Sequence, residues 1–398
     1  MGSSRISVKA RSALAALGLA VVGTTLGCAD EGGTKGLAAI PGKEDPGEDL
    51  GGNATAQNQE PTVLDERVVS YSDALRTASL KLTARLPKLE AIERIANADD
   101  AELEYETALD EMLDSPEFQL RMIRYFRDVF RQGGDAQMNT APNFAARILT
   151  EGRPLAELFT ATENNCPSYD NDTGAFVDGN CDNNVPKHAG VLTNPGTMKQ
   201  FYSNMAFRRV RWVQEVFACT KFPTEFSDTP EAKGAGTYTS PWDFGSISNT
   251  PIDFHDTKAV ICANCHTTIN HLAPLFANFD KDGMWQNDIQ VMTPLIPDPV
   301  KTELSHWLAE GEATAWRVDQ PAADLPALGQ ALAADPNVTE CLVARLWNFT
   351  MSKEDIVTDL STVPLAVIGP YISELSTNGA NLRETLRAMF KSDDFVKF

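Results

Sequence analysis

The stretch Cys262-Ala263-Asn264-Cys265-His266 constrains this chain more than any other feature of its sequence. Two cysteines separated by two residues and followed at once by a histidine form the pattern for covalent attachment of a c-type haem. One helical turn lets both thiols reach the two vinyl groups of a porphyrin, and the adjacent imidazole then ligates the iron. We therefore expect haem c to be bound through Cys262 and Cys265, with His266 as the proximal ligand.

Three other interpretations of this stretch stay open: a thioredoxin-like dithiol, half of a zinc site, and chance. A redox dithiol needs no histidine after it and usually follows a strand in a βαβ pattern, which this sequence lacks. A zinc site needs two further ligands at close spacing. His271 offers one of them, but no second cysteine pair exists. The haem interpretation requires export, because such haem is attached outside the cytoplasm.

The N-terminus has the pattern of an export signal. Three basic residues lie within the first eleven, and residues 13–22 are an apolar stretch too short to span a bilayer. We expect residues 1–28 to be a lipoprotein signal peptide with Cys28 lipidated, although Thr25 stands where an aliphatic residue is usual. Ordinary cleavage near the same point is the alternative. Ala29, the residue directly after Cys28, is not a signal for retention in the inner membrane. We therefore expect the protein at the periplasmic side of the outer membrane or at the cell surface.

The remaining cysteines point to an oxidising compartment. Once the lipidated cysteine and the two haem cysteines are set aside, four of the seven are left, an even number. Cys166 and Cys181 bracket one polar loop and are expected to form a disulfide. Cys219 and Cys341 would then join the middle of the chain to its C-terminal part, or stay as buried free thiols.

The charge balance excludes some classes of partner. With 34 Lys and Arg against 55 Asp and Glu, the formal net charge is −21. This charge argues against nucleic acid and against anionic lipid surfaces as partners. We therefore expect contact with a membrane through the lipid anchor only. Solubility alone explains the acidity equally well, and the sequence does not name the redox partner.

The pattern of apolar residues predicts a mostly α fold. Residues 29–64 are rich in Gly, Asp, Glu and Pro and read as a disordered linker. Beyond them apolar residues recur at steps of three and four, with little strand pattern. We expect an N-terminal helical region at 65–160, the cysteine loop and the haem c segment at 161–295, and a C-terminal helical domain at 296–398.

Individual elements follow from the same pattern. Ser115 and Pro116 predict a helix start, with serine as the cap and proline at the first helical position. The aromatic face of that helix is expected to belong to the core rather than to a cofactor pocket. Residues 196–218 predict one long helix, and the haem helix is expected to begin near Thr257.

The polar loop of residues 161–187 has a partial calcium pattern. Asp178, Asn180 and Asp182 alternate like the start of a calcium-binding loop, but the sixth and twelfth places lack the required Gly and Glu. A solvated loop closed by a disulfide is the favoured interpretation.

The haem segment resembles a known family, the cytochrome-c-like proteins of planctomycetes and myxobacteria that contain domains of unknown function 1588 and 1585, often with 1592. The matching residues are Cys262 to His266, Ile269, Leu272, Asn278, Phe279, Asp280, Gly283 and Trp285. The resemblance covers roughly residues 65–398 and implies an exported haem protein more firmly than any reaction. Where the family usually has Asp-Pro-Leu-Gly, this chain has Asn270-His271-Leu272-Ala273.

The resemblance also suggests a sixth iron ligand. The family commonly has a histidine several residues before the first haem cysteine, and His255 is its nearest match, displaced by about one residue. We expect His255 as the sixth ligand, with Met292 next. A methionine would raise the reduction potential and a second histidine would lower it. His271 is expected on the same side of the haem as His266. The remaining candidates are Met284 and His306.

Arg208, Arg209 and Arg211 lie in the middle of the predicted helix at 196–218. Guanidinium groups bind carboxylates well, so these side chains could pair with haem propionates or with the protein's own acids.

The sequence thus indicates an exported, lipid-anchored, monohaem c-type cytochrome that transfers single electrons in the cell envelope. A haem enzyme of peroxidase or oxidase type, with an open sixth position, is the first alternative. A surface-anchored binding or scaffold protein with a structural haem is the second. No Ser-His-Asp set, phosphate loop or closely spaced carboxylate pair stands out, so no catalytic residue is assigned.

Overall fold

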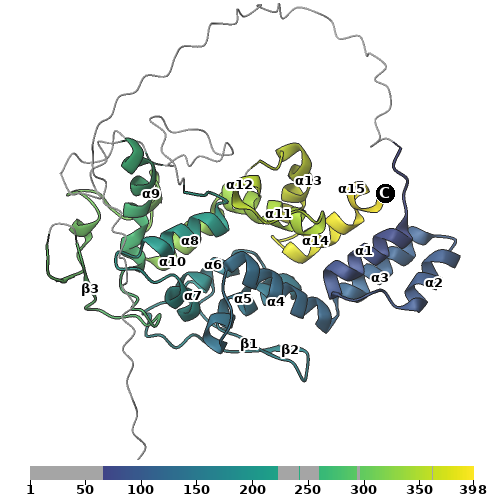
Figure 1. The fold of residues 1–398 in the computed structure, drawn as a ribbon, viewed down its shortest axis with the longest axis horizontal. Helices are drawn as coiled ribbons and strands as arrows, with labels where there is room; N and C mark the ends of the chain where they lie inside the picture. The colour runs from purple at the N-terminus through teal and green to yellow at the C-terminus, as the bar shows by residue number, and fades with distance from the viewer. Residues whose placement is uncertain (1–65, 223–241, 243–259, 294–295, 361) are drawn as a thin grey trace, which may run out of the picture. The chain divides into compact units, whose positions relative to one another are not determined.

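The computed structural model describes residues 66–222, 242, 260–293, 296–360 and 362–398, and of residues 260–264 it describes the backbone alone. The expected signal peptide with Cys28, the expected linker and His255 lie outside the described residues. Of the described residues, 56% are helical and 7% lie in strands, so the prediction of a mostly α fold is confirmed (Figure 1). Residues 61–398 form one compact unit. No helix in the described part of the chain has the length and apolarity to cross a membrane.

Helices build the first part of this unit. Ser115 caps its fourth helix as predicted, because the Ser115 hydroxyl accepts a hydrogen bond from the Phe118 amide at 3.2 Å, and Pro116 occupies the first helical position. The aromatic face of that helix is buried in the core, also as predicted. The helices are α1 (Tyr71–Thr83), α2 (Leu89–Asn97), α3 (Ala101–Leu113), α4 (Pro116–Phe130), α5 (Ala136–Thr150) and α6 (Glu157–Thr160).

The single helix predicted for residues 196–218 is wrong, because the structure has two helices there, α7 (Pro195–Gln200) and α8 (Phe207–Phe217). Ala206 adopts a left-handed backbone conformation with φ of 59°, which a continuous α-helix does not contain. The side chain of Arg209 ties α8 to α7 across this break. Its buried guanidinium donates to a backbone carbonyl of α7 that a continuous helix would use for its own next turn.

The polar loop contains a short antiparallel hairpin, β1 (Ser168–Asp170) and β2 (Ala175–Val177), which the sequence pattern does not predict. Its turn forms because the Asp170 carboxylate accepts a hydrogen bond from the Asp172 amide at 2.8 Å, a local bond typical of Asp in turns. The 3-10 helix η1 (Gly190–Thr193) follows the loop.

The residues of the partial calcium pattern are engaged within the protein. The Asp178 carboxylate forms an ion pair with Arg147 at 2.5 Å, and the Asn180 side-chain oxygen accepts a hydrogen bond from the Asn164 amide at 2.6 Å. These contacts favour the disulfide-closed loop over the calcium interpretation.

The Cys-Ala-Asn-Cys-His motif lies in α9 (Val260–Phe276), and the predicted start at Thr257 lies outside the described residues. After α9 the described chain forms short two-stranded antiparallel sheets and then a group of helices. The elements are β3 (Gln290–Val291), β4 (Val300–Lys301), the 3-10 helix η4 (Leu304–His306), β5 (Ala315–Arg317), β6 (Gln320–Pro321), α10 (Leu325–Ala334), α11 (Pro336–Thr350), α12 (Val357–Leu360), α13 (Leu365–Thr377), α14 (Leu382–Lys391) and α15 (Asp393–Val396).

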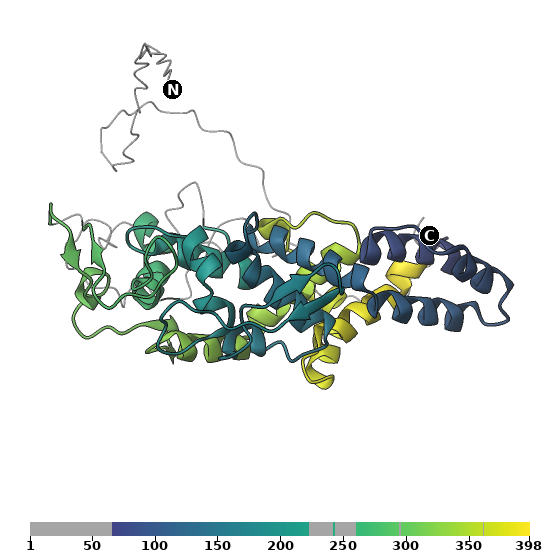
Figure 2. The ribbon, with the colours of Figure 1, turned by 90° about the horizontal axis from the view of Figure 1, so that it is seen from below.

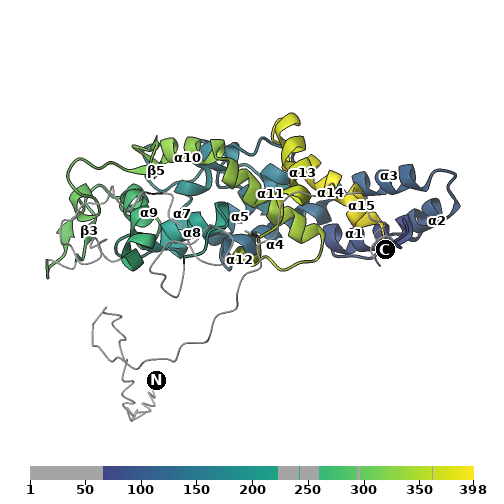
Figure 3. The ribbon, with the colours of Figure 1, turned by 90° about the horizontal axis from the view of Figure 1, so that it is seen from above.

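The last residues of the chain return to the start of α1. Val69 and Lys397 form an antiparallel bridge, and the Tyr105 hydroxyl of α3 donates to the Phe390 carbonyl of α14 at 2.7 Å. Arg387 of α14 also pairs with Asp110 of α3 at 2.5 Å. Figures 2 and 3 show α14 and α15 beside α1 and α3, whereas α9 lies at the end of this unit remote from them.

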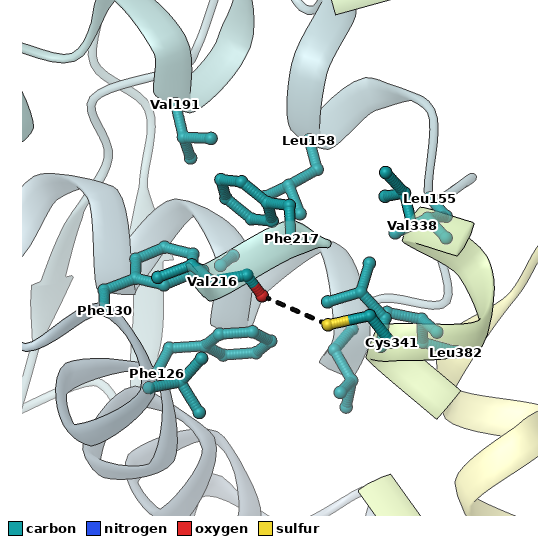
Figure 4. Packing of buried hydrophobic residues seen from close by; sticks show 14 of the residues in the cluster. Phe126, Phe130, Leu155, Leu158, Val191, Val216, Phe217, Val338, Cys341 and Leu382 are labelled. Carbon is teal, nitrogen blue, oxygen red and sulfur yellow. Dashed lines mark hydrogen bonds between the residues drawn. The ribbon is translucent and has the colours of Figure 1, made fainter. Parts of the chain in front are cut away.

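One hydrophobic core runs through the unit from α1 to α15. Phe126 and Phe130 of α4, Phe217 of α8 and Leu158 of α6 meet in its centre (Figure 4). Cys341 of α11 enters the same region, where its sulfur lies 3.5 Å from the Val216 carbonyl oxygen. The C-terminal helices therefore share a core with the middle of the chain.

Both expected disulfides are present. Cys166 bonds to Cys181 with a Cα–Cα distance of 5.0 Å, and Cys219 bonds to Cys341 with 5.4 Å. The buried free thiols considered as the alternative for Cys219 and Cys341 are thereby replaced by a covalent link between the end of α8 and α11.

We expect the longer loop to contribute more stability. The bridges span 15 and 122 residues, so the chain-entropy model gives a loss of about 3 kcal/mol for Cys166→Ser with Cys181→Ser and about 5 kcal/mol for Cys219→Ser with Cys341→Ser. Urea unfolding of the two double variants measures the order. Equal losses, or free thiols found by Ellman titration of unfolded, unreduced protein lacking Cys28 and carrying haem, would contradict this assignment.

Candidate functional site

The Cys-Ala-Asn-Cys-His motif occupies one face of α9. Residues 262, 265 and 266 stand at positions i, i+3 and i+4 of a continuous helix, a spacing that places positions on one side of the helix. Cys265 and His266 are partly buried there. Local helix formation alone thus brings together the two positions that would bond the porphyrin and the imidazole that would bind iron.

Asn270 and Phe207 both contact the imidazole of His266. Its Nδ1 lies 3.3 Å from the side-chain oxygen of Asn270, one turn further along α9. The ring of Phe207, the first residue of α8, packs edge-on against the imidazole with centroids 5.5 Å apart. Burial lowers the pKa of His266 from its ordinary value, while the bond to Asn270 opposes this shift. The imidazole is therefore neutral at pH 7, and the neutral ring is the form that binds metals.

These residues fit a haem iron. An amide oxygen only accepts hydrogen bonds, so the contact with Asn270 places the ring proton on Nδ1. Nε2 is then the nitrogen with the lone pair for a metal. Metal-binding histidines almost always donate their second ring N–H to an oxygen acceptor in this way. Cys262, Cys265 and His266 are thus the residues that would hold the group.

His271 leaves α9 on a different face from His266, although both belong to the same helix. Five residues at 3.6 per turn rotate the side chain by about 140°. The His271 Nδ1 donates to the Thr267 carbonyl at 2.6 Å, and the ring stacks on Trp242 at 3.7 Å between centroids. Its Nε2 is 3.7 Å from the Glu312 carboxylate, and burial lowers the pKa of His271. His271 is thus a packed core histidine.

The candidates for the sixth ligand are scattered. Met292 is 47% exposed. Its backbone N–H donates to the side-chain oxygen of Asn204, just before α8, and its carbonyl accepts from the side-chain nitrogen of the same residue. His306 uses its Nδ1 to accept from the Glu303 amide at 3.1 Å, in the cap of η4. Met284 is partly buried in the turn after α9. Met292 is thus held beside Asn204, three residues before Phe207, whose ring packs against His266.

The three arginines of α8 have different roles. Arg211 forms an ion pair with the buried Glu215 at 2.7 Å, which is the pairing with the protein's own acids considered above. Arg208 is exposed and donates to the Tyr202 carbonyl at 3.3 Å. Arg209 is 1% exposed, and its guanidinium donates to main-chain oxygens.

Arg209 fastens the end of α9, a role that the sequence analysis missed. Its Nη1 donates at 2.9 Å to the carbonyls of Phe276 and Phe279, and its Nη2 donates at 2.9 Å to that of Asp280. Nε and Nη2 reach the Met198 carbonyl at 3.0 and 2.7 Å. The positive charge thus lies at the negative end of the α9 dipole, which favours it. Burial lowers the pKa of Arg209 to about 10, so the side chain remains charged at pH 7.

The turn after α9 is also fixed by a close backbone approach. Gly283 has φ of 80°, and a Cβ there would lie 2.1 Å from the Pro195 carbonyl oxygen at the start of α7. Only glycine fits this position. Asn183 adds hydrogen bonds from its side-chain nitrogen to the Gly283 and Thr193 carbonyls at 3.1 and 2.9 Å. The C-terminal end of the motif helix is therefore anchored from two directions.

A second buried arginine repeats the arrangement of Arg209. Arg345 of α11 donates to the carbonyls of Glu215 and Val216 in the last turn of α8, at 2.8 and 3.1 Å, and also pairs with Asp355. Thus an arginine of α11 caps the C-terminal end of α8, and an arginine of α8 caps that of α9. These contacts connect the C-terminal helices to α9 through α8.

A cavity of about 480 Å³ lies at the C-terminal end of α9 and is lined in part by Leu275, Asn278, Trp285 and Trp307. Leu275 stands nine residues after His266, which is about two and a half turns, so the two residues lie on opposite faces of the helix. The cavity therefore opens away from the face that carries the motif.

Comparisons of this chain with protein-family models, curated proteins and solved structures found no match.

Proposed function

We propose that this protein is an exported, lipid-anchored, monohaem c-type cytochrome that transfers single electrons in the cell envelope. The observation that carries the proposal is the hydrogen bond and the position of His266. Its Nδ1 donates to Asn270, and it shares one helix face with the two motif cysteines. The resemblance of residues 262–285 to the cytochrome-c-like family with domains of unknown function 1588 and 1585 supports the same function, and we propose membership in that family.

The chain's own residues have separate tasks in this proposal. Cys262 and Cys265 hold the porphyrin through thioether bonds, and His266 ligates iron through Nε2. When bound, haem supplies an iron that takes up and releases one electron. Phe207 covers the imidazole with an apolar ring, which limits access of water and favours a fixed ring orientation.

The sixth position separates a carrier from an enzyme. An electron carrier keeps both axial positions filled, whereas a peroxidase or oxidase leaves one open for its substrate. We propose His255 as the sixth ligand on the strength of the family resemblance, with Met292 next because its backbone is held by Asn204 beside α8. Lipidation of Cys28 and a position at the periplasmic side of the outer membrane or the cell surface complete the proposal.

Optical spectroscopy of the purified protein tests this function. We expect a c-type haem spectrum with a six-coordinate, low-spin ferrous state that binds carbon monoxide poorly and turns over little peroxide. The physical reason is that two filled axial positions exclude small ligands from the iron. Absence of any haem band after production with the c-type maturation machinery would overturn the proposal.

Two variants identify the ligand and decide between the alternatives. His255→Ala should move the spectrum toward high spin and admit carbon monoxide, while Met292→Ala serves as the matched replacement. If only the Met292 variant changes, the carrier function stands with a different ligand. If the unmodified protein is already high spin and binds carbon monoxide readily, the haem enzyme is the better assignment.

A further inference from the structure

The side chain of Asn270 lies next to the motif and contacts its histidine. Asn270 is 5% exposed, and its side-chain oxygen lies 3.3 Å from Nδ1 of His266. The two residues stand four apart on α9, a spacing that places side chains over one another. Because the helix fixes both Cα atoms, this contact depends on no loop.

The surroundings also favour a fixed contact. Thr267 and Thr268, which lie between the two residues in sequence, are buried, and the Thr267 carbonyl is used by His271 at 2.6 Å. The Phe207 ring packs against the imidazole of His266. The imidazole is thus packed by an aromatic ring and hydrogen-bonded within its own helix.

We propose that Asn270 is a positioning residue that holds the tautomer and orientation of His266 and sets its strength as an electron donor to iron. This inference rests on the proposed function. A hydrogen-bond acceptor at Nδ1 raises the basicity of a metal-binding imidazole, and a charged acceptor raises it more than a neutral one. A more basic ligand stabilises the ferric state, so the acceptor at position 270 sets the reduction potential.

The tautomer is measured first, on the full chain produced without haem and labelled with ¹⁵N at its five histidines. Nitrogen–proton correlation spectra, with the signal of His266 identified by its loss in His266→Gln, should show the proton on Nδ1 of the unmodified chain. In Asn270→Leu, which keeps a similar volume without an acceptor, the proton should appear on Nε2 as well. Asn270→Asp should retain the Nδ1 proton. An Nε2 proton in the unmodified chain, or no change in the leucine variant, would overturn the proposal.

The reduction potential is measured second, on protein carrying haem. We expect the midpoint potential to rise in Asn270→Leu and to fall in Asn270→Asp. Asn278→Asp is the matched control, because it adds the same charge beyond the other end of α9, beside the cavity, without contacting His266. Its shift reports the effect of charge at a distance and should be smaller than that of Asn270→Asp.

The outcomes separate this inference from the proposed function. If haem is attached but both Asn270 variants shift the potential in the same direction, or by no more than the control, Asn270 has only a structural role and the inference fails while the proposed function stands. If no haem is attached to the unmodified chain, the proposed function fails, and the electronic part of the inference fails with it. The tautomer measurement still decides whether Asn270 positions the imidazole.

Discussion

Replacing Cys262 and Cys265 together with alanine is expected to abolish covalent haem, seen as complete loss of haem staining on a denaturing gel. Thioether bonds survive denaturation, whereas a haem held by His266 alone dissociates when the fold is lost. The described cysteines outside the motif form two disulfides, so their sulfurs are already bonded.

The double variant Cys166→Ser with Cys181→Ser is the matched control, since it also removes two cysteines from the chain but leaves the motif intact. It should keep its haem stain. Staining that persists in the alanine variant would exclude covalent attachment at the motif, and the dithiol, zinc and coincidence interpretations would then return.

Arg209→Met is expected to destabilise the fold by roughly 3–5 kcal/mol, because buried carbonyls lose a charged donor and each such loss costs about 1–3 kcal/mol. The carbonyls of Phe276 and Asp280 would keep one backbone N–H each. Those of Met198 and Phe279 would lose the guanidinium contacts described above. Arg209→Lys should recover only part of the loss, because one ammonium cannot reproduce the planar fork.

The neighbouring Arg208→Met is the matched control for this measurement. It makes the same chemical change on the same helix at an exposed position, so its free energy of unfolding should stay within about 0.5 kcal/mol of the unmodified protein. Urea unfolding measures all three variants. A similar small effect for Arg209→Met would mean that the end of α9 is held by other contacts.

Features that depend on local sequence could be predicted. Ser115 and Pro116 identified the start of α4 because capping is a matter of adjacent residues. The cysteine pairs followed from their even number and their position in the chain. The common face of residues 262, 265 and 266 followed from helical spacing.

Features that depend on distant partners could not be predicted. Arg209 donates to carbonyls about seventy residues further along the chain. Every residue has a backbone carbonyl, so the sequence does not indicate which of them will accept from a given arginine. Asn270 is a different case, because its spacing of four from His266 was visible in the sequence. The same periodicity places His271 on a different face of α9 from His266.

The bridge between Val69 and Lys397 has a consequence for how a tethered molecule would meet its partner. A lipid at Cys28 would connect to the fold at the end formed by α1, α14 and α15, remote from α9 (Figures 2 and 3). Residues 29–64 add at most about 130 Å of contour length in any conformation, at roughly 3.6 Å per residue. The anchor would thus limit the distance between the fold and its point of attachment, and a redox partner of the motif helix would have to lie within that reach.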